Sequence, residues 1–278
     1  MALAACAGPS ERPAGAPNAV ALAATPDGTV WTIDRASASV VATRGGLVVR
    51  RLGGLGTGDD ALLDPVALDP TNGQAVFVAD RAAGAVVQFT VEGRLAASLP
   101  VPDVDPAGPV RQRPRDGRRG QPVAVAAAPD GALYVADAGR RHVLRLDAEG
   151  AVERVLGAAG PGALADPVGL AVADDGTVWV ADAGRGALQA FDPFGAPGRA
   201  VPAAPELGRV VGISVWGRTV ALVGARGVAL VDGDAVRTTV RPDGRPDLQA
   251  AALVGPTRWW ALSAGRVELG EAAPPEAE

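Results

Sequence analysis

The sequence predicts an all-β protein that folds as a six-bladed β-propeller, mostly with four-stranded antiparallel blades. Three observations lead to this fold. Six segments repeat one pattern, in which a turn is followed by a β-forming run and then by a polar residue. The copies follow one another at a spacing typical of propeller blades. In addition, an aromatic side chain returns at one position of the run in five of the six copies.

Four copies of the pattern are clear. They are PDGTVWTIDR at 26–35, TNGQAVFVADR at 71–81, PDGALYVADAG at 129–139 and ADDGTVWVADAG at 173–184. Two weaker copies follow, WGRTVALVGARG at 216–227 and GPTRWWALSAGR at 255–266, in which Gly224 and Ser263 replace the final Asp. The successive offsets are 46, 57, 45, 42 and 39 residues.

The fourth copy shows how each unit divides into strands. Residues 168–172 form an apolar inner strand, and an Asp-Asp-Gly turn follows at 174–176. A second strand is expected at 178–181, a third at 188–191 and a short outer strand at 198–201. These runs are apolar without clean alternation, as expected for strands that are buried on both faces between neighbouring blades.

The repeated aromatic position predicts the packing between blades. A row of aromatic rings could serve as a stacking platform for bases or sugars. Rings at one fixed height are better explained as core residues that pack between neighbouring blades, and we interpret them in this way. Through the six copies the position holds Trp31, Phe77, Tyr134, Trp179, Ala221 and Trp260. Nearby Trp216 is a candidate to fill the volume that Ala221 leaves.

These motifs resemble NHL repeats. The resemblance rests on Val-Tyr/Trp-Val-Ala-Asp after a Pro-Asp-Gly turn, and on Asp-Pro-Val at 64–66 and 166–168, where an inner strand opens. The sequence follows the NHL pattern well over residues 19–200 and poorly over residues 206–270. It implies that the repeated aspartates satisfy turn amides and are structural; these are Asp34, Asp80, Asp137 and Asp182. One fold hosts many functions, so the resemblance is informative about fold and not about activity.

Composition excludes several classes of function. The net charge is −5, which argues against a nucleic-acid-binding surface. All 26 basic residues are Arg. Without Lys, Schiff-base chemistry and a P-loop lysine are excluded. The abundance of Ala, Gly, Pro and Arg suggests a GC-rich bacterial source.

The N-terminal residues suggest a lipid anchor. Leu3-Ala4-Ala5-Cys6 has the form of a bacterial lipobox, with Cys6 as the lipidation candidate, and residues 1–18 are interpreted as a flexible tether. Only five residues precede Cys6, so this hypothesis requires a basic and apolar leader upstream. We therefore expect the protein to be located in the cell envelope and to contact the membrane only through a lipid on Cys6. The alternative is a cytoplasmic protein with an ordinary cysteine.

Catalytic chemistry has little support in the sequence. Six-bladed propellers related to NHL proteins include metal-dependent lactonases and lyases, which hold a divalent ion in the central funnel. This chain has one His, His142, so a zinc site with several His ligands is impossible. Asp64, Asp166 and Glu206 could still offer carboxylates at the channel, but Asp-Pro at a strand start more often forms a turn. We expect no catalytic residue, no metal and no cofactor, a channel lined by small residues, and His142 at the surface.

One connection is about a dozen residues longer than the others. Residues 100–121 carry five arginines in an otherwise acidic chain: Arg111, Arg113, Arg115, Arg118 and Arg119. Arginine clusters recognise carboxylates and phosphates through paired donors, which makes these residues candidates for partner binding. A solvated connector is the alternative, because Asp103, Asp105 and Asp116 can neutralise part of the charge.

The sequence therefore favours a non-catalytic protein-binding or scaffolding propeller of the cell envelope. It could be a subunit of a membrane-associated complex. The alternative is a metal-dependent hydrolase or lyase of the gluconolactonase-like type. The propeller is expected at 19–270 and a disordered tail at 271–278. Three strands are expected in the sixth blade, near 249–254, 259–263 and 266–269, unless part of 10–18 completes it.

Overall fold

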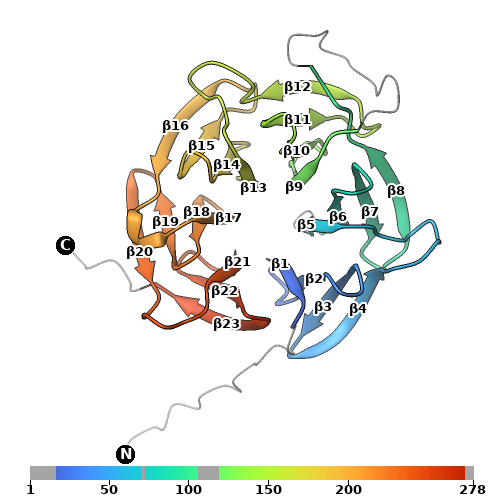
Figure 1. Ribbon diagram of the computed structural model, residues 1–278, viewed down its shortest axis with the longest axis horizontal. Coiled ribbons are helices and arrows are strands. Elements are labelled where there is room, and N and C mark those ends of the chain that lie inside the picture. The colour runs from blue at the N-terminus through green and yellow to red at the C-terminus, as the bar shows by residue number, and fades with distance from the viewer. Residues whose placement is uncertain (1–16, 71–72, 106–118, 273–278) are drawn as a thin grey trace, which may run out of the picture.

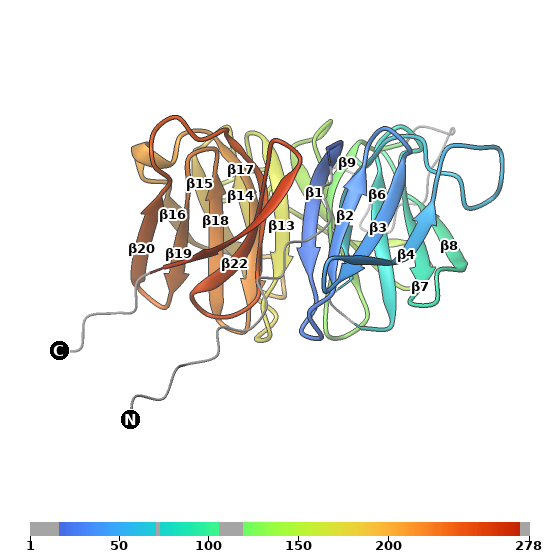
Figure 2. The ribbon, with the colours of Figure 1, turned by 90° about the horizontal axis from the view of Figure 1, so that it is seen from below.

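A computed structural model describes residues 17–70, 73–105 and 119–272. This part of the chain forms six antiparallel β-sheets arranged as a ring (Figure 1). In each sheet the strands lie side by side in chain order, the first at the centre of the ring and the last at the rim. From the side, the ring is a disc whose strands run between two faces (Figure 2). The predicted all-β six-bladed propeller is confirmed.

The first five blades have four strands each. Blade I contains β1 (Ala19–Ala24), β2 (Val30–Asp34), β3 (Ser39–Arg44) and β4 (Leu47–Gly53). Blade II contains β5 (Pro65–Asp69), β6 (Ala75–Asp80), β7 (Ala85–Thr90) and β8 (Leu95–Pro100). Blade III contains β9 (Pro122–Ala127), β10 (Leu133–Asp137), β11 (His142–Leu146) and β12 (Val152–Leu156).

Blade IV contains β13 (Pro167–Val172), β14 (Val178–Asp182), β15 (Ala187–Phe191) and β16 (Pro197–Pro202). A short 3-10 helix, η1 (Pro205–Leu207), leads to blade V, which contains β17 (Val210–Trp216), β18 (Thr219–Gly224), β19 (Gly227–Asp232) and β20 (Ala235–Val240). Blade VI has three strands among the described residues, β21 (Leu248–Leu253), β22 (Arg258–Ser263) and β23 (Arg266–Glu271). The three predicted strands of blade VI are confirmed, and residues 10–16 lie outside the described part.

Each contact between neighbouring blades has its own hydrophobic core. For example, Trp31 and Val40 of blade I pack with Val76 and Phe89 of blade II. Five of the six cores contain between ten and thirteen buried residues. The core between blades VI and I contains six. The second strands are therefore apolar on both faces because each face meets a different neighbour.

The repeated aromatic residues pack in these cores, as predicted. Trp31, Phe77, Tyr134 and Trp179 are at most 7% exposed. Trp260 is partly buried, and Ala221 is fully buried in the core between blades V and VI. Trp216 packs against the core that contains Ala221, consistent with its expected role as a filler.

Three of the repeated aspartates connect their blades to the loops that precede them, whereas Asp34 accepts the N–H groups of Ala36 and Ser37 in the turn that follows it. Asp80 is fully buried, and its carboxylate accepts the backbone N–H groups of Leu63 (2.6 Å), Asp64 (3.0 Å) and Ala83 (3.1 Å). Asp137 and Asp182 each accept three N–H groups in the same way. A buried carboxylate is stable when backbone donors replace its lost hydration. The structural role predicted for these residues is confirmed.

Blades V and VI use other residues for this connection. A Cβ added at Gly224 would lie 2.4 Å from the carbonyl oxygen of Leu207, so η1 occupies the space that the Asp fills elsewhere. In blade VI, the Ser263 hydroxyl donates to the carbonyl of Pro246 at 2.9 Å, and Arg241 contacts both groups. The final Asp is therefore replaced in the two weak copies because the loops that precede blades V and VI differ from the loops that precede the other blades.

The disc has two distinct faces. The turn face carries the hairpin turns that join the first strand to the second in every blade, and the third strand to the fourth in blades I to V. The connection face carries the second-to-third turns and the connections between blades. No helix in the described part of the chain is long and apolar enough to cross a bilayer.

One prediction about a side chain was wrong. His142 was expected at the surface, but it is fully buried as the first residue of β11. It lies opposite Asp137 in the β10–β11 ladder. The sequence places it beside a turn, yet β11 begins one residue earlier than the apolar run suggests, which brings the imidazole inside the blade.

Candidate functional site

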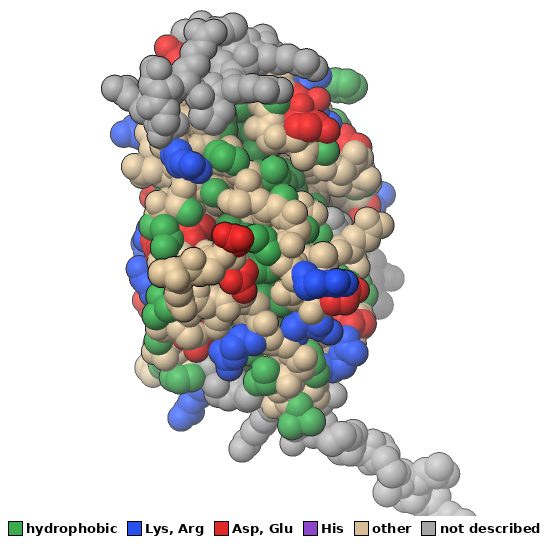
Figure 3. Space-filling model, turned by 90° about the vertical axis from the view of Figure 1, so that its right-hand side faces the viewer, with side chains coloured by type: hydrophobic (Ala, Val, Ile, Leu, Met, Phe, Trp, Pro, Cys, Tyr) green, Lys and Arg blue, Asp and Glu red, His purple; other side chains and the backbone are tan. Residues whose placement is uncertain are grey.

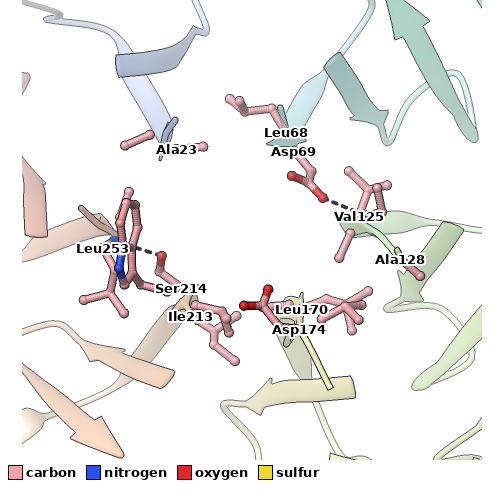
Figure 4. A pocket seen from close by; sticks show the side chains of 18 of the residues that line it. Ala23, Leu68, Asp69, Val125, Ala128, Leu170, Asp174, Ile213, Ser214 and Leu253 are labelled. Carbon is pink, nitrogen blue, oxygen red and sulfur yellow. Dashed lines mark hydrogen bonds between the residues drawn. The ribbon is translucent and has the colours of Figure 1, made fainter. Parts of the chain in front are cut away.

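A cavity lies at the centre of the ring, where the channel opens on the turn face. It has a volume of about 490 Å³ and is lined by residues from all six blades. Most of the lining side chains are apolar, with Leu22, Leu68, Leu170 and Ile213 among them. Figure 4 shows three polar side chains among these apolar ones, from Asp69, Asp174 and Ser214. Trp216 also lines the cavity.

Asp69 and Ser214 occupy the same register position in blades that are three positions apart around the ring. Each lies opposite the repeated aromatic position of the second strand, Asp69 opposite Phe77 and Ser214 opposite Ala221. At this position the other four blades have alanine: Ala23, Ala126, Ala171 and Ala252.

The two polar residues also make equivalent contacts with the next blade. The Asp69 carboxylate accepts the N–H of Ala127 at 2.6 Å, and the Ser214 hydroxyl oxygen accepts the N–H of Leu253 at 2.9 Å. Asp69 is 7% exposed. Both side chains are thereby fixed at the channel wall, so a ligand would meet them already oriented.

Asp174 belongs to the first turn of blade IV, but the turn does not require it. The neighbouring Asp175 accepts the N–H of Thr177 at 2.9 Å, as Asp27 and Asp130 do in their own turns. Blades I and III have Pro26 and Pro129 where blade IV has Asp174. The Asp174 side chain points into the channel (Figure 4), and it forms no hydrogen bond or ion pair with any described residue.

The connection that carries the arginines predicted to bind a partner joins β8 to β9, and its described ends, 101–105 and 119–121, belong to the connection face. Arg111, Arg113, Arg115 and Arg118 lie outside the described residues. Arg119 is exposed and pairs with Pro102 in an isolated bridge. Near it, Arg140 of the second-to-third turn forms an ion pair with Asp103. The candidate lipidation residue, Cys6, also lies outside the described part.

The carboxylates considered as metal ligands are not brought together at the channel cavity. Asp64 forms ion pairs with Arg81 at 2.6 Å and Arg35 at 3.8 Å. Asp166 and Glu206 are exposed, and none of the three lines the cavity. Within the described residues, no group of three or more His, Cys, Asp or Glu side chains is arranged to hold a metal ion.

His142 has an unusual environment for a buried imidazole. Neither ring nitrogen has a hydrogen-bond partner among the described residues, and neither has the Asp137 Oδ2 atom. Burial lowers the pKa of His142, and Arg140 acts in the same direction, while Asp137 and Asp103 act against it. The neutral imidazole is therefore favoured inside blade III.

Comparison with protein families identifies one repeat. The NHL repeat family matches residues 164–191, the segment that covers β13, β14 and β15. The chain carries an NHL repeat in a six-bladed β-propeller. No curated protein sequence matches this chain.

Solved structures share the six-bladed fold of this chain at low sequence identity. A catalytically inactive variant of virginiamycin B lyase from Staphylococcus aureus, crystallised with quinupristin, has a TM-score of 0.65 and 12% identity. That match covers 90% of this chain and 79% of the lyase. A streptogramin B lyase structure has a TM-score of 0.65 and 13% identity over 93% of this chain and 95% of that one. At this identity the likeness concerns the fold alone.

Sequence reasoning missed the polar residues of the channel mouth. A channel lined by small residues was expected, and alanines do line much of it, but Asp69, Asp174, Ser214 and Trp216 also contribute. Comparing the copies could have found two of them. Asp69 stands where most copies have Ala, and Asp174 where two copies have Pro.

Proposed function

We propose that the protein is a non-catalytic protein-binding or scaffolding propeller of the bacterial cell envelope. The partner would bind the connection face over blades I to III. The observation that carries this proposal is a pair of exposed leucines, Leu55 and Leu63, on the connection between β4 and β5. Their exposed fractions are 70% and 62%.

This connection is held firmly although its leucines face solvent. The Leu55 N–H donates to the carbonyl of Ser37 at 3.0 Å, and the Leu62 N–H donates to Gly54 at 3.1 Å. The Leu62 side chain is fully buried, and the Leu63 N–H is held by Asp80. A surface that is ordered before binding loses less conformational entropy in the complex, which favours affinity.

Charged groups next to the leucines would add specificity. Arg35 and Arg81 both contact Asp64, which directly follows Leu63. Figure 3 shows basic and acidic side chains next to one another, with hydrophobic groups between them, on the right-hand side of the ring as drawn in Figure 1. Arginines around an apolar patch suit a partner with an apolar contact and acidic neighbours, because complementary charges raise the association rate.

The envelope location is supported by the sequence of Leu3-Ala4-Ala5-Cys6. A lipidated Cys6 would hold the propeller at a membrane surface. Fractionation of cells that express the native gene tests this part. The wild type should be found with membranes and the Cys6→Ser variant in the soluble fraction; wild type in the soluble fraction would refute the location.

The binding part is tested on a partner identified by cross-linking in the envelope. The double variant Leu55→Ser/Leu63→Ser should weaken binding at least tenfold, since each buried Leu contributes about 1.5–3 kcal/mol. Leu47→Ser is the matched control, because Leu47 is 73% exposed but follows a hairpin turn on the opposite face. Equal affinities for the double variant and the control would refute the proposal.

The long arginine connection is tested separately. Residues 100–121 are shortened to the length of the β12–β13 connection, which should leave the fold intact because closure entropy changes slowly with loop length. If Arg111, Arg113, Arg115, Arg118 and Arg119 contact the partner, the shortened protein should associate more slowly and with a smaller dependence on salt. Equal rates and equal salt dependence would mean that this connection is a solvated spacer.

A further inference from the structure

The channel mouth on the turn face combines a cavity with a net negative lining. Asp69 and Asp174 supply two carboxylates, and the lining residues include no Arg and no His. The cavity of about 490 Å³ is large enough for a small organic molecule. Its negative charge would repel an anion of that size.

The turn face around the mouth is also acidic. Among the described residues, its hairpin turns contain two arginines, Arg94 and Arg218. The same turns contain nine carboxylates: Asp27, Glu92, Asp130, Asp147, Glu149, Asp174, Asp175, Asp192 and Asp234. Three of the nine form ion pairs with arginines of neighbouring strands: Asp27 with Arg44, Asp130 with Arg145 and Asp234 with Arg199. The other six still outnumber the two arginines of the turns, and negative charges around a low-dielectric opening concentrate cations there.

The remaining wall is suited to an apolar body. Leucine, isoleucine and valine side chains from several blades line the cavity, and Trp216 adds an aromatic ring. An aromatic face attracts a cation, and an apolar wall gains free energy when it excludes water. An inorganic cation would use the carboxylates but would gain nothing from the apolar wall.

We propose that this mouth is a binding site for a small organic cation, a protonated amine or quaternary ammonium with an apolar body. Asp174 binds the cationic group, because its carboxylate points into the channel and has no partner among the described residues. Asp69, held by the N–H of Ala127, adds a second negative charge from across the mouth (Figure 4). The apolar body packs against Leu170, Ile213 and Trp216.

This site is separate from the proposed partner surface, because it opens on the other face of the disc. Its test uses calorimetric titration with phenethylamine and with phenethyl alcohol, its neutral analogue. The amine should bind with a dissociation constant of about 1 mM or lower, and the alcohol about tenfold more weakly. Equal binding of the two, or no detectable binding of the amine, would overturn the proposal.

Two charge-matched variants show whether the site is at the channel. Asp174→Asn should weaken amine binding about fivefold to tenfold and leave alcohol binding unchanged. Asp234→Asn removes the same charge from the same face, but Asp234 is fully exposed, contacts Arg199 and does not line the cavity. It should change amine binding less than twofold. Equal effects of the two variants would show that only the general charge of the face matters, and would refute the site.

A calcium titration completes the experiment. Calcium chloride at the concentration of the amine should neither give comparable heat nor displace the amine, because the apolar wall contributes only to an organic ligand. Complete displacement by calcium would show a site for charge alone and would also overturn the proposal. Both variants should unfold at the wild-type temperature, since neither carboxylate lies in a buried network.

Discussion

His142 makes the stability of this protein depend on pH in a range where few other groups titrate. It is the single histidine of the chain, there is no lysine, and carboxylates ordinarily titrate near pH 4. Burial lowers the pKa of His142 in the folded protein, whereas the unfolded chain has the ordinary value of about 6.5. Near and below pH 6.5 the unfolded state therefore binds more protons at this residue than the folded state does.

The sign and size of the effect follow from this difference. A group with a lowered folded pKa contributes its full stability above the unfolded pKa and loses it as the pH falls toward the folded pKa. While the buried imidazole stays neutral, each pH unit below 6.5 costs about 1.4 kcal/mol. The fall in the free energy of unfolding between pH 7 and pH 5.5 is therefore at most about 1.2 kcal/mol, the limit reached when the folded imidazole stays neutral over that range.

Urea unfolding at both pH values measures this fall in the wild type and in His142→Leu, a variant with an apolar side chain of similar size. The variant should lose the dependence on pH, since Leu does not titrate and leaves no buried ring nitrogen without a partner. NMR titration of the single imidazole gives the folded pKa directly. The reasoning is refuted if that pKa is 6.5 or above, or if the variant shows the same fall as the wild type.

Two further predictions concern the blade framework. Asp80→Ala removes an acceptor shared by three backbone N–H groups and should cost about 3 kcal/mol, measured by urea unfolding. The control is Asp59→Ala, an exposed residue of the β4–β5 connection that Asp80 holds, and equal midpoints would contradict the structural role of Asp80. Trp179→Ala, at 7% exposure, should cost about 3–5 kcal/mol by the same measurement. Trp260→Ala should cost less because Trp260 is partly exposed, and the reverse order would contradict the assigned packing.

The fold could be predicted because its signals are local and repeated. Each Pro-Asp-Gly or related turn marks a hairpin, and the aromatic position aligns the copies even where the final Asp is lost. The burial of His142 could not be predicted, because it depends on where β11 begins and on the loops above blade III. Gly224 is similar: its small size makes sense only when η1 is seen 2.4 Å from a Cβ at that position.

The candidate site was harder to predict than the fold. Asp69 and Asp174 lie more than one hundred residues apart, in blades II and IV, and in each copy they look like ordinary turn or strand-end residues. Only the closure of the ring brings them to one cavity. The arginines were easier to notice because they are clustered in sequence.

The closing point of the ring has a mechanical consequence. Within the described residues, blades VI and I share no strand, so six buried side chains, among them Leu22, Val30 and Leu262, hold the first and last blades together. A force that pulls the two ends of the chain apart would act on this interface, which has the smallest of the six cores, before it breaks the hydrogen bonds within any sheet. Under such a force we expect the ring to open first between blades VI and I while the other five interfaces between blades stay intact. A partner that binds across blades VI and I would oppose this opening.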